Sequence, residues 1–141
     1  TTMDSYTPVS LTASATLNRS HAGTTVVLNA AAGLTVTLPA ASGTGDVYTI
    51  LVGTTVTSNS YIVKVANASD VMMGTLDVAT DIAGVTCPTT STSDTITMSG
   101  TTTGGILGSR IVLTDIATNK WGVTGGLVSS GVEATPFSAT V

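Results

Sequence analysis

Charged side chains are scarce in this chain. Four Lys and Arg and eight Asp and Glu occur among 141 residues, and the formal net charge is −4. An ordinary soluble domain carries about a quarter charged residues. A folded chain of this size exposes roughly 6,700 Å², which leaves about 550 Å² of surface for each formal charge. Much of the surface must therefore be threonine, serine and backbone, or be covered by other protein chains, which favours a structural or display protein over a cytosolic enzyme.

The sequence also lacks a basic cluster and a long apolar run. Its four basic residues, Arg19, Lys64, Arg110 and Lys120, are scattered. Binding to a phosphate backbone needs clustered cations, so neither nucleic acid nor an anionic membrane surface is an expected partner. Apolar runs such as residues 50–52 are far too short to cross a bilayer.

Cysteine and histidine occur once each. Cys87 has no partner for an intrachain disulfide and no Lys, Arg or His within several residues, which favours a small buried hydrophobe over a reactive thiol. Ser20 and His21 are neighbours in a turn, but adjacency along a chain does not align a serine with its base. One His and one Cys do not complete a zinc site. We expect no metal, no cofactor and no catalytic residue.

The acidic residues show no motif. Asp77 and Asp81, with Asp70 and Asp94 farther off, lack the spacing of a calcium-binding loop, so we interpret them as solvated turn carboxylates. A glycosidase needs two carboxylates in one cleft. Nothing in the sequence indicates that Asp115 and Glu133 meet, and nothing excludes it.

Two further features are better explained by a structural role than by a functional one. Gly43-Thr44-Gly45 resembles part of a phosphate loop, but the Gly-Lys-Ser/Thr that would follow is missing and a β turn fits better. Trp121 is the only tryptophan, at the start of a predicted hairpin strand. This position favours a core or interface anchor over a platform for sugar binding.

Alternation of apolar and polar residues with a period of two predicts β-strands throughout. The pattern is clear at residues 9–17 and 34–38, whereas residues 47–52 are apolar on both faces and predict a central strand. A hairpin is predicted from 110–114 and 121–124. Further strands are predicted at 24–29, 61–66 and 94–98, with one or two short ones within 71–88 and a last one including Val128 and residues 137–141. No window has a helical apolar stripe.

These strands predict an all-β fold: a single-domain antiparallel β-sandwich or barrel, jelly-roll-like, with eight to ten short strands. The domain covers residues 9–141, and residues 1–8 form an N-terminal arm. We expect the arm to associate with a neighbouring subunit through Met3 and Tyr6. The predicted core is the apolar phase of the strands: Leu11, Leu17, Leu28, Leu34, Val36, Leu38, Ile50, Val63 and Trp121.

Three segments carry a family resemblance. They are LTASATLNRSHAGTTVVLNAAAGLTVTLPAASGTG (11–45), DVYTILVGTTVTSNSYIVKVANASD (46–70) and VLTDIATNKWGVTG (112–125). Together they resemble the small capsid decoration proteins, also called cement or head proteins, of tailed bacteriophages. Thr37-Leu38-Pro39 before the glycine-rich loop and the hairpin ending at Trp121 are the most specific pieces.

The resemblance implies a non-enzymatic virion protein. Such subunits, commonly homotrimers, bind the capsid exterior and reinforce junctions between subunits of the major capsid protein. Synthesis in the host cytoplasm is expected, since Thr1 is what removal of an initiator Met leaves. Similar Leu-Pro-Ala-Ala patterns with a glycine loop occur in phage fibre and tail-tip modules, so a receptor-binding module is the alternative. A phage depolymerase domain, which needs a carboxylate pair or a triad in a groove, is the contrasting enzyme hypothesis.

Overall fold

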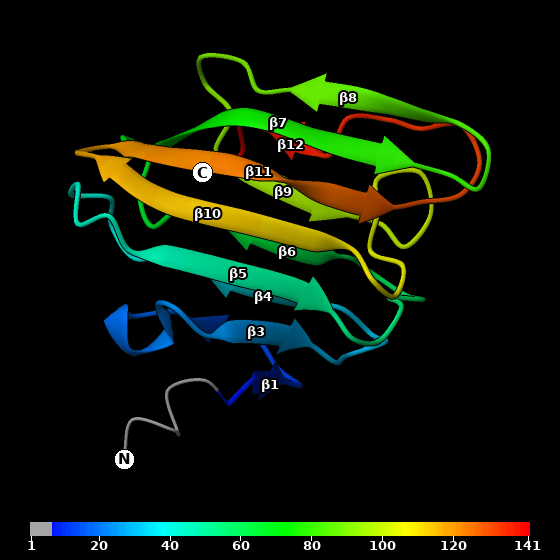
Figure 1. Ribbon diagram of the computed structural model, residues 1–141, viewed down its shortest axis with the longest axis horizontal. Helices are drawn as coiled ribbons and strands as arrows, with labels where there is room; N and C mark the ends of the chain where they lie inside the picture. Colours follow the sequence, from blue (N-terminus) through cyan, green and yellow to red (C-terminus); the bar gives the residue numbers. More distant parts are fainter. Residues whose placement is uncertain (1–6) are drawn as a thin grey trace.

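The computed structural model describes residues 7–141 and arranges their strands in two facing sheets (Figure 1). Met3 and Tyr6 lie outside the described residues. The seven-stranded sheet has the order β1 (Val9–Leu11), β3 (Thr25–Leu28), β5 (Val47–Val52), β10 (Arg110–Ala117), β11 (Lys120–Val128), β7 (Val71–Ala79) and β8 (Gly84–Pro88). The five-stranded sheet has the order β12 (Phe137–Ser138), β9 (Thr95–Met98), β6 (Tyr61–Lys64), β4 (Leu34–Thr37) and β2 (Ala15–Thr16).

The first half of the chain winds as a coil between the two sheets. Successive strands alternate, so that β1, β3 and β5 lie in one sheet and β2, β4 and β6 in the other, and each set pairs in parallel. Each strand of one sheet serves as the crossover between two parallel strands of the other. Tight corners are needed, and Gly33 (φ +85°) makes one, because a Cβ there would lie 2.5 Å from the Ser60 carbonyl oxygen.

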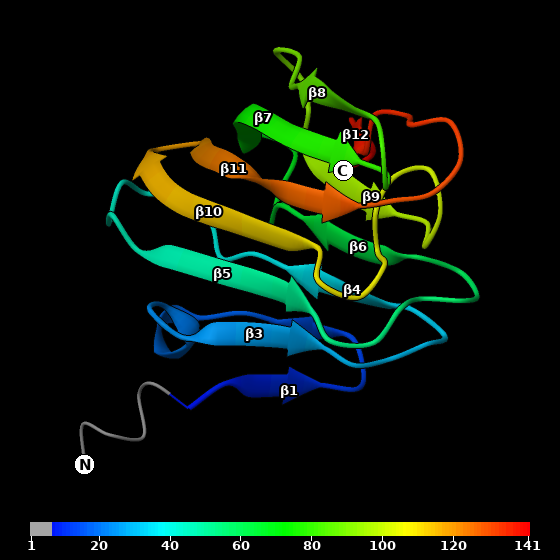
Figure 2. The ribbon, with the colours of Figure 1, turned by 45° about the vertical axis from the view of Figure 1, so that its right-hand side comes forward.

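The second half adds a hairpin and closes the larger sheet. β10 pairs antiparallel with both β5 and β11, and only Thr118 and Asn119 separate β10 from β11. Asn119 has a φ of 64°, a conformation that Asn tolerates in two-residue hairpin turns. β7 lies parallel to β11 on its other side, and β8 follows β7 as an antiparallel edge strand (Figure 2).

The core lies between the inner faces of the two sheets. Trp121 and Tyr48 are fully buried, with ring centroids 5.6 Å apart in an edge-to-face arrangement. The predicted core is confirmed for eight residues: Leu17, Leu28, Leu34, Val36, Leu38, Ile50, Val63 and Trp121. Leu11 is only partly buried, because it lies on edge strand β1. Period-two alternation therefore identified the inward side chains correctly.

The all-β sandwich is confirmed, but several details of the prediction are wrong. The sheets are mixed rather than antiparallel, and the first half of the chain is not a jelly roll, because its neighbouring strands within each sheet run parallel. The described residues form twelve strands rather than eight to ten. The predicted strand 9–17 is two strands in opposite sheets, joined by exposed residues 12–14, and 71–88 contains a nine-residue strand, β7, whose alternation is interrupted at Gly74.

Candidate functional site

Asp115 is the most heavily bonded carboxylate in the described chain. Its Oδ1 accepts hydrogen bonds from the Gly43 and Ser42 amides at 2.7 and 3.0 Å, and its Oδ2 accepts one from the Thr44 hydroxyl at 3.0 Å. Burial alone would raise the pKa of Asp115, but these hydrogen bonds outweigh it and lower the pKa below its usual value. The loop amides that a phosphate would need are thus bound to the protein's own carboxylate.

Ser20 and His21 lie in a short 3₁₀ turn, Arg19–His21, which is capped by the side chains of Asn18 and His21. The His21 Nδ1 accepts a hydrogen bond from the Asn18 amide at 3.1 Å, and the Asn18 side chain accepts one from the Ser20 amide at 2.9 Å. Beside them, Arg19 forms an exposed ion pair with Asp46 at 2.8 Å. The arrangement stabilises a turn and does not align a nucleophile with a base.

Asp115 and Glu133 lie at opposite ends of the larger sheet. Asp115 pairs with Trp121 near the start of β11. Glu133 accepts a hydrogen bond from Thr80, which follows the β7 residue that pairs with Val128 at the end of β11. Seven strand residues, or about 24 Å, separate these ends, which is too far for a carboxylate pair.

The interpretation as solvated carboxylates is confirmed for Asp77 and Asp81, which are exposed. Asp77 accepts a hydrogen bond from Thr86 at 2.7 Å, and Asp81 is exposed between β7 and β8. Within residues 7–141, no three His, Cys, Asp or Glu side chains are grouped so that they could hold a metal ion.

The interpretation as solvated turn carboxylates is wrong for Asp70 and Asp94, which are buried. The Asp70 Oδ2 accepts the Ala41 amide at 2.9 Å, and the Asp94 Oδ1 accepts the Thr140 amide at 2.9 Å. Each fastens a segment distant in sequence onto the sandwich. Asp70 directly precedes β7 and Asp94 directly precedes β9. This position was the only feature of the sequence that could have indicated their burial.

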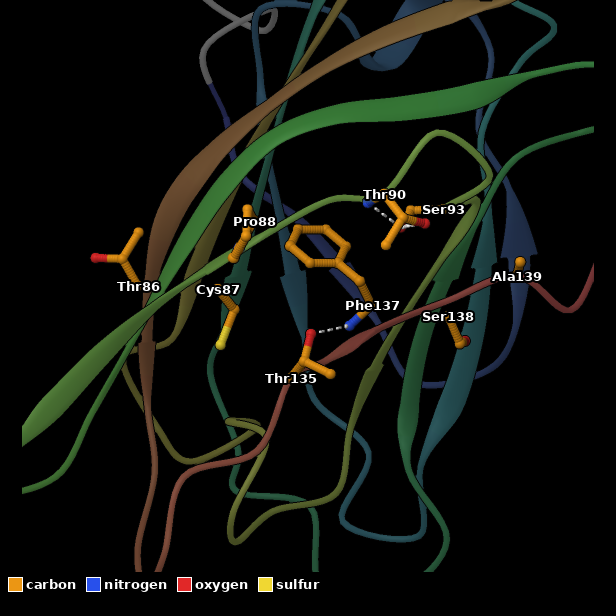
Figure 3. Close-up of a pocket in the computed structure, with 9 residues that line it drawn as sticks. All are labelled: Thr86, Cys87, Pro88, Thr90, Ser93, Thr135, Phe137, Ser138 and Ala139. Carbon is orange, nitrogen blue, oxygen red and sulfur yellow. Dashed lines mark hydrogen bonds between the residues drawn. The ribbon is translucent and has the colours of Figure 1, made fainter.

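Cys87 lines a cavity of about 390 Å³ beside the edge strands β8 and β12 (Figure 3). Phe137 projects into this region near Pro88, and both Cys87 and Phe137 are buried. The remaining lining residues are Thr86, Pro88, Thr90, Ser93, Thr135, Ser138 and Ala139. No charged side chain lines the cavity, so it offers packing and hydroxyl groups rather than acid–base chemistry. The burial predicted for Cys87 is confirmed.

The outer face of the seven-stranded sheet is a broad surface that carries little charge. Its side chains alternate with the buried ones and are half-buried or exposed. They include Val27, Thr49, Leu51, Val112, Thr114, Thr124, Met73 and Thr86, with glycines at 122 and 126. Its charged members are Arg110 and Asp77, and Lys120 at one end of β11. The face is therefore mostly threonine, small residues and aliphatic groups.

The outer face of the five-stranded sheet has the same character. Thr35, Thr37 and Thr97 point away from the core and are half-buried, and Lys64 is the charged side chain among them. Thr95 lies on the same side of the sheet but is buried, with its hydroxyl 2.9 Å from that of Thr140. Both broad faces of the sandwich are thus poor in charge. The expected consequence of the composition, a surface of threonine and small residues, is seen in the structure.

Comparison with protein-family models, with curated proteins and with solved structures found no match. No helix in the described part of the chain has the length and apolar character needed to span a membrane. The assignment of a function therefore depends on the chain's own surfaces and on the resemblance of its sequence segments.

Proposed function

We propose that this chain is a non-enzymatic virion structural protein that binds the outer surface of a tailed-phage capsid and stabilises the lattice of the major capsid protein. The observation that carries the proposal is that the outer faces of both sheets are poor in charge. Protein interfaces are depleted in Asp, Glu and Lys at their centres. A broad exposed face of this composition is suited to contact with protein.

The polar groups of the described chain support a non-enzymatic role. Asp115, Asp70 and Asp94 hold loops and the C-terminal segment, and His21 caps a turn. Each of these groups already has a structural partner inside the protein. A depolymerase would instead need carboxylates facing a groove, and Asp115 and Glu133 are at opposite ends of the sheet.

The proposal includes self-association as a homotrimer at symmetric positions of the capsid lattice. Edge strands β1 and β8 present backbone groups that a neighbouring chain can cover. Symmetric association also buries apolar surface that a monomer leaves in water. Repetition over the lattice lets contacts of modest affinity stiffen the whole shell, because every added subunit bridges further capsid proteins.

Co-sedimentation with capsids tests the proposal. The purified chain is mixed with empty capsids of the matching phage and pelleted, and then the loaded capsids are heated or treated with chelator. We expect saturable binding, a solution mass near three chains and better survival of loaded capsids than of bare ones. A monomer that ignores capsids but binds host-cell surfaces would overturn the proposal in favour of the fibre or tail-tip module.

A further inference from the structure

Two opposite charges lie in one row across the outer face of the seven-stranded sheet. Gly126 on β11 is paired with Arg110 on β10 and with Asp77 on β7. Neighbouring strands are about 4.8 Å apart, so the backbones at Arg110 and Asp77 are about 10 Å apart with the glycine between them. All three residues are exposed.

The two charges do not pair with each other across the glycine. The ion pair found within residues 7–141 joins Arg19 to Asp46, and Arg110 takes no part in it. Asp77 is turned toward the edge strand, where it accepts the Thr86 hydroxyl. The row therefore presents a positive group on one side of a flat centre and a negative group on the other.

No internal contact requires a glycine at position 126. Its φ is not positive, and a Cβ added there would meet no atom within 4 Å. Gly125 beside it is different, because a Cβ there would clash with the Arg110 carbonyl oxygen. Glycine weakens a strand interior, and it often marks a place where another backbone approaches closely. A missing side chain at the centre of the row leaves room for a partner outside the protein.

The face is large enough for a specific contact. The seven strands span about 29 Å and average about six residues, or about 21 Å, which gives a projected area of roughly 600 Å² before the relief of the side chains is counted. A standard interface buries about 800 Å² on each partner. The two areas are comparable.

We propose that this face contacts a second copy of the chain, with Arg110 of one copy beside Asp77 of the other and Gly126 at the point of closest approach. The row is its own electrostatic complement. When a second copy is rotated by 180° about an axis parallel to the strands, its Asp77 lies opposite Arg110 of the first copy and its Arg110 lies opposite Asp77. Flanking threonines and aliphatic groups exclude water around the pair. The contact is two-fold, so it is a second mode of self-association beside the threefold one in the proposed function, and it leaves the outer face of the five-stranded sheet free for the capsid.

Charge reversal tests the pairing. Sedimentation velocity is measured for wild type, Arg110→Asp, Asp77→Arg and the double variant, with folding checked by circular dichroism. Each single reversal places like charges together and should weaken association about tenfold or more. The double variant should recover most of the wild-type association. An equimolar mixture of the two single variants should associate more than either alone, because a row of two acids then faces a row of two bases.

Lys64→Asp is the matched control. It changes the net charge by the same amount as Arg110→Asp but lies on the opposite sheet, so it should associate like wild type. If all the reversals weaken association equally, or if neither the double variant nor the mixture recovers it, the proposed pairing is wrong.

Substitution of Gly126 gives a second, independent readout. Gly126→Ala and Gly126→Gln add side chains into open space, so the melting temperature should stay unchanged or rise, whereas association should fall progressively with side-chain size. Unchanged association in the folded Gln variant would overturn the close approach.

The outcomes also separate this contact from the proposed function. A chain that associates through this face but does not bind capsids would support the contact and overturn the capsid role. A chain that binds capsids but remains monomeric up to its solubility limit would support the capsid role and overturn the contact.

Discussion

Replacement of Asp115 by asparagine should destabilise the protein, because its carboxylate fastens the loop after β4 to the end of β10. Asparagine keeps the shape but offers one acceptor oxygen and an NH₂ group, so a donor then faces the loop donors of Ser42, Gly43 and Thr44. A hydrogen bond to a charged acceptor contributes about 1.5 to 3 kcal/mol, and a buried donor left without a partner costs about 1 to 3 kcal/mol. We expect Asp115→Asn to lower the free energy of unfolding by about 2 to 4 kcal/mol at neutral pH.

The loss should depend on pH in a defined direction. The folded pKa of Asp115 is lower than its usual value, so the folded state binds this proton less readily than the unfolded state. Its contribution to stability is fully present above the unfolded pKa of about 3.9. It is lost as the pH falls from there through the folded pKa. The difference between wild type and Asp115→Asn should therefore be largest at neutral pH and shrink in acid.

Urea unfolding followed by tryptophan fluorescence measures the difference, since Trp121 is buried beside this end of the sheet. Asp81→Asn serves as the control, because Asp81 is exposed between β7 and β8. It should change stability little at any pH. Equal stability of wild type and Asp115→Asn at neutral pH, or a difference that grows in acid, would refute the role assigned to the carboxylate.

Three further predictions concern the core, the thiol and the arm. Leu34→Ala and Leu38→Ala should each cost about 2 to 5 kcal/mol in equilibrium unfolding, because both side chains are buried and leave cavities; neutral results would contradict their placement. Cys87→Ser should keep association and capsid binding with at most a loss of packing, so a folded variant without function would indicate a reactive thiol. Deletion of residues 1–7 should weaken capsid binding in pelleting assays more than it lowers the melting temperature, and equal binding would remove the role of the arm.

The candidate surface was only partly predictable from the sequence. Scarce charge indicated a surface of threonine and small residues, and the structure has such faces on both sheets. The row of Arg110, Gly126 and Asp77 was not predictable, because three strands separated along the chain bring it together. The bond between Asp115 and the loop at Gly43 likewise joins residues more than seventy positions apart.

The sequence by itself determined most of the strands and most of the side chains that face inward. Alternation is a local property, since successive side chains of an extended chain point to opposite sides. It located β3, β4, β5 and β6 within a few residues and identified most of the core.

Only the tertiary structure decided which strands become neighbours. Residues 9–17 alternate without interruption, yet the chain crosses from one sheet to the other at residues 12–14. Either pairing buries the same apolar side chains, so the local pattern does not distinguish a hairpin from a coil of parallel strands. The choice depends on the packing of the two complete sheets and on corners such as Gly33, whose close contact with Ser60 exists only in the folded chain.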